Sequence, residues 1–194
     1  IYARYGFSDF ILALGYKSEV IKDYFLHYHA QRSDLTIDLK SGQVEYDNPL
    51  VEDWQVSLID TGLHTMTGGR LLRLKDSLEL DGTFMLTYGD GVSDVDITAL
   101  VDFHRSHGRL ATVTAVRPPV RFGELDTKGS RVTSFQEKPQ AEQGWVSGGF
   151  FVFETGIFDL ITDDSTLLER QPLEELARDG ELMSYQHSGY WQCM

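Results

Sequence analysis

The fold is decided by the stretch Phe84-Met85-Leu86-Thr87-Tyr88-Gly89-Asp90-Gly91. Its first five residues form an almost continuously apolar run, which is typical of a strand buried on both faces of a sheet. The strand ends abruptly at the Gly-Asp-Gly turn. In an open α/β sheet, ligands bind beyond the carboxyl ends of the strands. We therefore expect Asp90 at an edge of the sheet that a ligand can reach.

Strands and helices alternate on both sides of this stretch. Further strands are predicted at residues 10–14, 36–39, 55–59, 111–116, 148–153 and 182–186, and a hairpin from residues 122–125 and 131–136. Helices are predicted from Ser18, from Thr67 through Leu78, from Asp96 to Gly108 and over residues 167–177, with Ser18 and Thr67 as caps. This order predicts one α/β domain over residues 1–194, with a Rossmann-like, mostly parallel central sheet, helices on both faces and a small β-hairpin region.

The composition narrows the classes of function. The 194 residues carry 17 Lys and Arg against 30 Asp and Glu, a net charge of −13, which argues against a nucleic-acid surface. Small phosphate ligands stay possible, because a few cations, backbone N–H groups or a metal ion can hold them. The single cysteine, Cys193, excludes an internal disulfide framework and a Cys-rich zinc site. With no apolar run near the roughly 18 residues of a membrane span, we expect a cytoplasmic protein.

The Gly-Asp-Gly turn is a candidate metal site. A carboxylate at the end of a buried strand is a usual ligand for Mg²⁺ beside phosphates, and the flanking glycines let backbone approach a ligand closely. The alternative is a plain Asp-Gly turn. A calcium loop of the EF-hand type is excluded, because Val92 and Val95 stand where an oxygen ligand and a glycine are needed.

Two further motifs are candidates for ligand binding. Residues 65–70, Thr-Met-Thr-Gly-Gly-Arg, lead into a helix, and paired glycines there expose N–H groups for an anion or a base edge, while Arg70 supplies a forked donor. The alternative is a capped helix with a solvated arginine. Residues 136–139, Gln-Glu-Lys-Pro, hold Lys138 in a defined direction because Pro139 makes its predecessor extended. The alternative is a surface pair with Glu137.

The histidines are weaker candidates. His27 and His29 are two residues apart and so point to different faces of a helix, which is poor geometry for a shared metal ion. His104 and His107 are better spaced but have no third ligand nearby, and we interpret them as part of a solvated helix face. The sequence also contains no Gly-x-Ser-x-Gly elbow and no P-loop, which excludes those two enzyme classes.

Taken in chain order, these motifs resemble the sugar-phosphate nucleotidyltransferases, and the resemblance covers essentially the whole chain. It is carried by residues 11–17 (Ile-Leu-Ala-Leu-Gly-Tyr-Lys), 60–62 (Asp-Thr-Gly), 67–70 (Thr-Gly-Gly-Arg), 87–92 (Thr-Tyr-Gly-Asp-Gly-Val), 121–125 (Arg-Phe-Gly-Glu-Leu), 134–139 (Ser-Phe-Gln-Glu-Lys-Pro), 148–152 (Gly-Gly-Phe-Phe-Val) and 189–192 (Gly-Tyr-Trp-Gln). The Thr-Gly-Gly-Arg and Gly-Tyr-Trp-Gln stretches point to the cytidylyl branch of that family.

The resemblance implies a reaction and a set of site residues. The reaction would join CTP and α-D-glucose 1-phosphate to give CDP-glucose and pyrophosphate, as part of nucleotide-sugar biosynthesis. The implied catalytic residues are Asp90, which would bind Mg²⁺, and Lys138, which would hold the sugar phosphate. The implied substrate-binding residues are Thr65 and Arg70 for the cytidine part, Gly89 beside the nucleotide, Lys138 for the sugar phosphate, Glu137 and Gly149 near the glucose hydroxyl groups, and Tyr88. Asp90 and Lys138 would then face each other across one cleft.

Two features of the family lie outside these 194 residues. The family opens with a strand and a Gly-rich loop that wraps the triphosphate, and its second metal-binding aspartate follows a methionine such as Met194. We therefore expect the 194-residue chain alone to have little activity and the complete protein to be active. We also expect a homo-oligomer, because loss of the first strand exposes an apolar sheet edge.

Two alternatives stay open from the sequence. One is a sugar-phosphate nucleotidyltransferase that uses UTP or dTTP. The other is a non-catalytic domain of the same fold that only binds a sugar phosphate.

Overall fold

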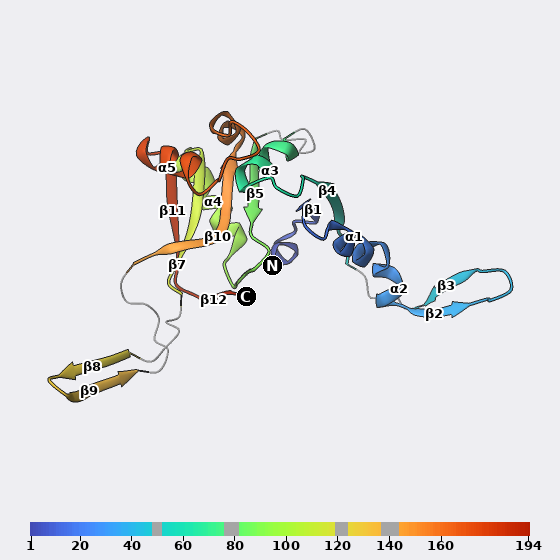
Figure 1. The fold of residues 1–194 in the computed structure, drawn as a ribbon, viewed down its shortest axis with the longest axis horizontal. Helices are drawn as coiled ribbons and strands as arrows, with labels where there is room; N and C mark the ends of the chain where they lie inside the picture. Colours follow the sequence, from blue (N-terminus) through green and yellow to red (C-terminus); the bar gives the residue numbers. More distant parts are fainter. Residues whose placement is uncertain (48–51, 76–81, 119–123, 137–143) are drawn as a thin grey trace.

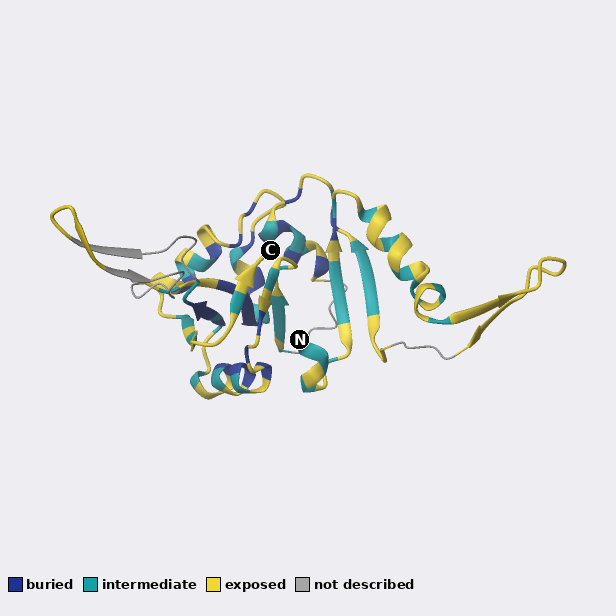
Figure 2. Cartoon of the chain, turned by 90° about the horizontal axis from the view of Figure 1, so that it is seen from below, coloured by how far each residue is buried: buried dark blue, intermediate teal, exposed yellow. Residues whose placement is uncertain are grey.

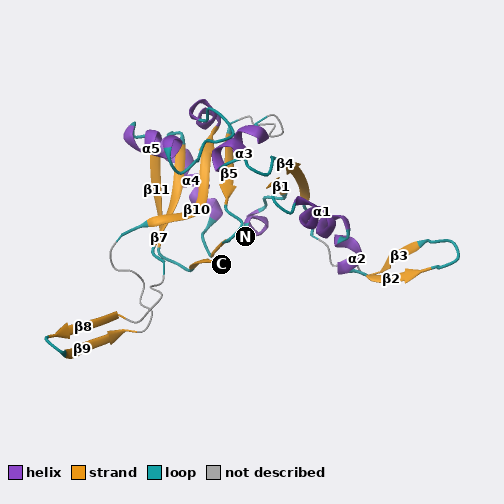
Figure 3. Cartoon of the chain, in the orientation of Figure 1, coloured by secondary structure: helices purple, strands orange, loops and turns teal. Residues whose placement is uncertain are grey.

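A computed structural model describes residues 1–47, 52–75, 82–118, 124–136 and 144–194 as a mixed α/β fold (Figures 1 and 3). The strands are β1 Asp9–Leu14, β2 Asp34–Ile37, β3 Val44–Asp47, β4 Gln55–Asp60, β5 Thr83–Thr87, β6 Gly91–Ser93, β7 Ala111–Val116, β8 Glu124–Lys128, β9 Arg131–Gln136, β10 Val146–Glu154, β11 Leu182–His187 and β12 Trp191–Cys193. The helices are α1 Ser18–Leu26, α2 Tyr28–Arg32, α3 Thr67–Leu74, α4 Ile97–His107 and α5 Gln171–Arg178, with 3₁₀ turns η1 Tyr2–Tyr5 and η2 Thr155–Leu160.

The central sheet has the strand order β11-β7-β10-β5. Strand β11 is parallel to β7, whereas β10 is antiparallel to both β7 and β5, so β5, β7 and β11 run in one direction and β10 in the other. Strands β1 and β4 form a separate parallel pair, in which Leu14 is opposite Asp60. The α/β class with parallel strands, predicted from the sequence, is confirmed.

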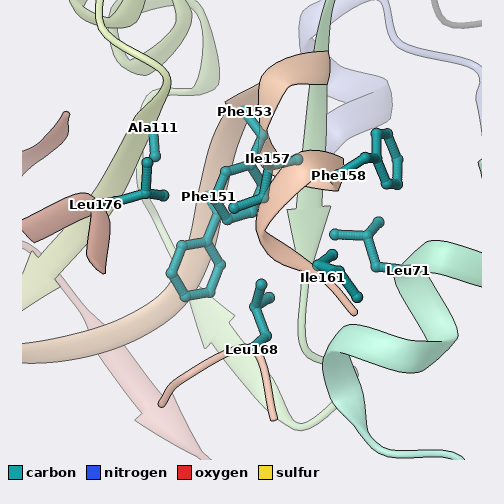
Figure 4. Close-up of a cluster of buried hydrophobic side chains, with 9 residues drawn as sticks. All are labelled: Leu71, Ala111, Phe151, Phe153, Ile157, Phe158, Ile161, Leu168 and Leu176. Atoms are coloured by element: carbon teal, nitrogen blue, oxygen red, sulfur yellow. The ribbon is translucent and has the colours of Figure 1, made fainter. Parts of the chain in front are cut away.

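The core lies on both faces of β10, whose side chains alternate between two hydrophobic clusters. Phe151 and Phe153 pack with residues from α3, η2 and α5 on one face, as Figure 4 shows. Phe150 and Val152 pack with residues from α4 on the other face. Burial on both faces explains the unbroken apolar run of this strand, and it places helices on both sides of the sheet as predicted.

Helix ends were predicted with mixed success. At α4 the Asp96 side chain accepts a hydrogen bond from the Ala99 N–H (2.9 Å), and Gly108 ends the helix in the left-handed conformation, at φ 62°. The caps predicted at Ser18 and Thr67 are wrong: the N-cap residues are Lys17 and Met66, and Ser18 and Thr67 are the first residues inside their helices. The Thr67 hydroxyl instead donates to Glu169 and accepts from the Leu168 N–H.

One further helix boundary differs from the prediction, and another is not tested. Helix α5 starts at Gln171, not at residue 167, so Pro172 lies in the first turn, where its missing N–H costs nothing. The end of the second predicted helix, at Leu78, lies outside the described residues.

Two hairpins project from the body in opposite directions (Figure 1). The predicted hairpin is confirmed as β8 paired with β9, although the first residues expected for it, 122 and 123, lie outside the described part of the chain. The other hairpin pairs β2 with β3, and all residues of these two strands are exposed. The strand predicted at residues 36–39 therefore belongs to the β2–β3 hairpin and not to the central sheet.

Candidate functional site

The carboxyl ends of β1 and β4 hold the side chain of Arg70. Its Nη1 group donates to the carbonyl oxygen of Leu14 (3.0 Å) and to the hydroxyl of Thr61 (2.7 Å). Thr61 is fully buried, and its own hydroxyl donates to the same Leu14 oxygen at 2.8 Å. The Nε and Nη2 groups of Arg70 have no hydrogen bond within the described part of the chain, so these two groups, with three N–H donors, remain for a ligand.

The segment that leads into α3 is tightly packed. Thr65 is buried, at 7% exposure, directly before Met66. The N–H groups of Gly68 and Gly69 both donate to the Thr166 carbonyl oxygen, at 2.9 and 3.3 Å. The expectation that these glycines expose N–H groups to an anion or a base is therefore wrong. They are needed for close packing, because a Cβ at Gly69 would lie 2.5 Å from the backbone of Asp164.

An ion pair also connects α3 to Asp164. The guanidinium of Arg73 makes two hydrogen bonds to the Asp164 carboxylate, with Nε at 2.8 Å from Oδ1. The hydrogen bond from Arg73 lowers the pKa of the Asp164 carboxyl group. The pair is half exposed and so contributes little stability by itself, but it fixes residue 164 beside α3.

Tyr88 and Gly149 lie together at the carboxyl end of β5. The Tyr88 N–H donates to the Gly149 carbonyl oxygen (3.1 Å). Gly149 has φ 75°, and a Cβ there would come within 3.1 Å of the Tyr88 ring. The Tyr88 hydroxyl donates to Glu169, and burial, together with that carboxylate, raises the pKa of Tyr88. A glycine is thus required at position 149 by both its conformation and its neighbour.

Asp90 follows on the exposed edge, as predicted. The Met194 N–H donates to the Asp90 carbonyl oxygen (2.9 Å), and the Cys193 thiol donates to its Oδ2 (3.5 Å), since β12 pairs with β6. A Cβ at Gly89 would meet no atom within 4 Å, so the space beside the turn is open. An exposed carboxylate in open space fits Mg²⁺, which keeps several waters and needs only one or two carboxylates. Within the described ranges no group of three metal-ligating side chains occurs.

The remaining predicted residues, Glu137 and Lys138, lie outside the described residues, so the facing of Asp90 and Lys138 across one cleft stays a prediction. Of the other site residues, Thr65 and Arg70 lie around the start of α3, and Tyr88, Gly89, Asp90 and Gly149 gather at the end of β5.

The residue that connects these two groups, Glu169, was not predicted from the sequence. Glu169 accepts hydrogen bonds from both Thr67 and Tyr88. No local pattern marks it, because it precedes α5 and meets partners far away in the sequence. The interpretation of His104 as solvated is also wrong: it is 1% exposed, with Nδ1 at 2.9 Å from the Thr112 hydroxyl and Nε2 at 3.1 Å from Glu154. Those partners lie on β7 and β10, which the helical spacing of the histidines does not reveal.

Comparison with known proteins first defines the class. The family model described as "Nucleotidyl transferase" matches residues 68–192, more than half of the chain. The crystal structure of HddC from Yersinia pseudotuberculosis superposes with a TM-score of 0.67, covering 99% of this chain and 75% of that one; at 20% identity this shows the fold alone. The chain therefore belongs to the nucleotidyl transferase family.

Two relatives narrow the class. The chain is 47% identical over its whole length, and over 76% of the relative's length, to the glucose-1-phosphate cytidylyltransferase of Salmonella typhimurium. It is 42% identical, over 98% of its length and 74% of the relative's, to a probable glucose-1-phosphate cytidylyltransferase of Bacillus subtilis. The chain belongs to the glucose-1-phosphate cytidylyltransferase family, which confirms the resemblance found from the motifs. No helix in the part of the chain that the structure describes could cross a membrane.

Proposed function

We propose that this protein transfers a cytidylyl group from CTP to α-D-glucose 1-phosphate, giving CDP-glucose and pyrophosphate with the help of Mg²⁺. The observation that carries the proposal is the 47% identity over the whole chain, which spans both groups of site residues. A phosphate oxygen of the sugar phosphate attacks the α-phosphorus of CTP. The bond from that phosphorus to the bridging oxygen breaks, and pyrophosphate leaves with the electron pair.

Arg70 is proposed to select the base. Its two remaining donor groups, Nε and Nη2, can serve the acceptor edge of cytosine, while Nη1 is fixed by Leu14 and Thr61. A donor that is held in place before the ligand arrives loses little entropy on binding. Thr65, buried beside this arginine's helix, is proposed to line the same pocket.

Asp90 is proposed as the ligand of the metal ion. When bound, Mg²⁺ neutralises negative charge on the phosphates during transfer. The exposed carboxylate of Asp90 and the open space beside Gly89 support this assignment. In the family a second metal-binding aspartate follows a methionine, and the contact between Met194 and Asp90 brings the end of β12 to the same place.

The sugar phosphate is proposed to bind next to Tyr88 and Gly149, with Lys138 as its counter-ion and Glu137 near the glucose hydroxyl groups. A fixed ammonium group allows two anionic substrates to approach each other, which is the main requirement of phosphoryl transfer. The close contact between Tyr88 and Gly149 supports a rigid binding surface at this position.

The proposal is tested with the complete protein, meaning this chain with any flanking sequence that its gene encodes. Release of pyrophosphate is measured with glucose 1-phosphate, Mg²⁺ and each of CTP, UTP and dTTP in turn. We expect turnover with CTP, and we expect Arg70→Lys to raise KM for CTP about tenfold or more, because a bidentate arginine site is not satisfied by lysine. Preferred use of UTP or dTTP would overturn the base assignment, and binding of glucose 1-phosphate without turnover would favour a non-catalytic domain.

We also propose that the protein forms a homo-oligomer in the cytoplasm. The arm made by α1, α2, β2 and β3 consists largely of exposed residues (Figure 2). Large apolar side chains are among them, which suits a contact between copies. They are Val20, Ile21, Tyr24, Leu26, Leu35, Ile37, Leu39, Val44 and Tyr46. Sedimentation equilibrium of the complete protein tests this, and a monomer at all concentrations would refute it.

A further inference from the structure

One short segment, residues 164–169, clamps the start of α3, and we call it the clamp segment. The Met66 N–H donates to the Asp164 carbonyl oxygen (2.8 Å), and the Leu168 N–H donates to the Thr67 hydroxyl (2.9 Å). These bonds add to those that the Thr166 carbonyl oxygen accepts from the two glycines of α3. The clamp segment therefore supplies partners for the backbone N–H groups that begin the helix, which a helix cannot satisfy by itself.

Glu169, the last residue of the clamp segment, connects the two groups of site residues. Its Oε2 accepts a hydrogen bond from the Thr67 hydroxyl (2.7 Å), beside Thr65 and Arg70. Its Oε1 accepts a hydrogen bond from the hydroxyl of Tyr88, which lies two residues before Asp90 in the chain. One carboxylate thus joins the start of α3 to the end of β5.

The position of Glu169 is fixed by its neighbours and not by its own burial. Its side chain is exposed, but the preceding residue, Leu168, is completely buried in the hydrophobic cluster drawn in Figure 4. The ring of Tyr88 is fixed in turn by its contact with Gly149. A carboxylate held between two fixed hydroxyl groups sets the distance between the elements that carry them.

We propose that Glu169 is a positioning residue for nucleotidyl transfer, which holds the Thr65–Arg70 segment in register with Tyr88, Gly89 and Asp90. This inference rests on the proposed function. If Arg70 holds the base and Asp90 holds the metal ion that binds the phosphates, the bridge through Glu169 fixes where the α-phosphorus lies relative to the attacking oxygen. Glu169 does not contact the reacting atoms, so its loss changes alignment more than affinity. Misplacement by about 1 Å can cost about 100-fold in rate.

The first experiment compares Glu169→Ala with Glu174→Ala in the complete protein. Glu174 is an exposed glutamate on α5, so its variant loses the same charge nearby without touching the bridge. We expect Glu169→Ala to lower kcat at least tenfold, with KM for CTP and for glucose 1-phosphate changed less than threefold and Tm close to wild type. We expect Glu174→Ala to behave as wild type. A normal kcat in Glu169→Ala, or a loss no larger than the loss of folded protein, overturns the inference.

The second experiment tests the bridge itself with Tyr88→Phe, which removes only the hydroxyl group and keeps the ring against Gly149. If Glu169 acts through Tyr88, the double variant with Glu169→Ala has the kcat of Glu169→Ala alone, because there is nothing left for the second change to remove. Multiplied losses would show that the two residues act independently and would overturn the bridge. A wild-type protein without CTP-dependent turnover would overturn the proposed function together with this inference, whereas an active wild type with a normal Glu169→Ala would overturn the inference alone.

Discussion

The guanidinium group of Arg70 lies directly against the main chain of Gly15: a Cβ at position 15 would come within 2.5 Å of Nη1 and 2.6 Å of Nη2. Gly15 has an ordinary φ, so its lack of a side chain is needed for this contact and not for its backbone conformation. The glycine after β1 is therefore part of the base pocket that we propose, although it need not touch a ligand.

Gly15→Ala follows as a prediction. The added methyl group meets the far end of a flexible side chain, which can move away, so we expect a change in unfolding free energy of no more than about 1 kcal/mol. The displaced guanidinium loses its bonds to Leu14 and Thr61, and KM for CTP rises several-fold. Urea unfolding measures the change in unfolding free energy, and initial-rate kinetics measure KM for CTP. If the variant binds CTP normally, either Arg70 does not hold the base or its position does not depend on Gly15, and the Arg70→Lys variant separates these cases.

Two glycine variants distinguish a glycine that is needed for packing from a glycine that leaves space for a ligand. In Gly69→Ala the methyl group meets main chain of Asp164 at 2.5 Å, which cannot move away cheaply. We expect a loss of about 1–3 kcal/mol of stability, even though alanine is the better helix former. In Gly89→Ala nothing lies within 4 Å and φ is not positive, so we expect stability within about 0.5 kcal/mol of wild type.

The activity of the second variant is the informative measurement. If the nucleotide lies against Gly89 as proposed, Gly89→Ala raises KM for CTP while Tm stays unchanged. Equal activity of Gly89→Ala and wild type would remove Gly89 from the proposed binding surface. Thermal unfolding that is also unchanged in Gly69→Ala would show that residues 164–169 do not pack on α3 as described.

Local signals in the sequence predicted those parts of the fold that depend on neighbouring residues. The cap at Asp96 and the left-handed end at Gly108 need only a few adjacent residues, and both are found. The same reasoning failed at Thr67, because its hydroxyl bonds to Glu169, about a hundred positions further along the chain. Sequence alone gives no means to weigh a local cap against a distant partner.

In the candidate site too, local features could be predicted and contacts between distant residues could not. The Gly-Asp-Gly turn could be placed at the end of a buried strand, since a strand end and a turn are local features. The paired glycines before Arg70 are a candidate for ligand binding in the sequence, yet their N–H groups donate to the Thr166 carbonyl oxygen, which the sequence could not reveal. The role of Lys138 stays a prediction.

Asp90→Asn tests the metal assignment. The side chain is exposed and keeps its shape in the variant, so we expect Tm to change by little. Because an amide is a poorer Mg²⁺ ligand than a carboxylate, we expect kcat/KM to fall about 100-fold and higher Mg²⁺ to recover part of the loss. Activity is measured across a Mg²⁺ titration, with EDTA-treated wild type as the reference. A variant with the wild-type Mg²⁺ dependence would remove Asp90 from the metal site.

The half-buried His107 of α4 predicts how stability depends on pH. The Nδ1 atom of His107 accepts from the Arg109 N–H (2.9 Å), so its Nε2 carries the proton and donates to the Thr112 hydroxyl (2.8 Å). Burial lowers the pKa of His107, and the nearby His104 and Arg109 lower it further. The unfolded chain therefore binds more protons than the folded one just below the ordinary histidine pKa. Stability that is present above about pH 6.5 is lost as the pH falls through the lowered pKa of the folded state.

His107→Gln removes this titration while its amide can still donate to Thr112 and accept from Arg109. We expect a plot of Tm against pH from 7.5 to 5 to be flatter for this variant than for wild type, because the neutral amide binds no proton in either state. The control is His29→Gln, which changes an exposed histidine on α2 and should leave the wild-type slope unchanged. An equal slope in His107→Gln and wild type would show that protonation of His107 does not govern the acid sensitivity of the fold.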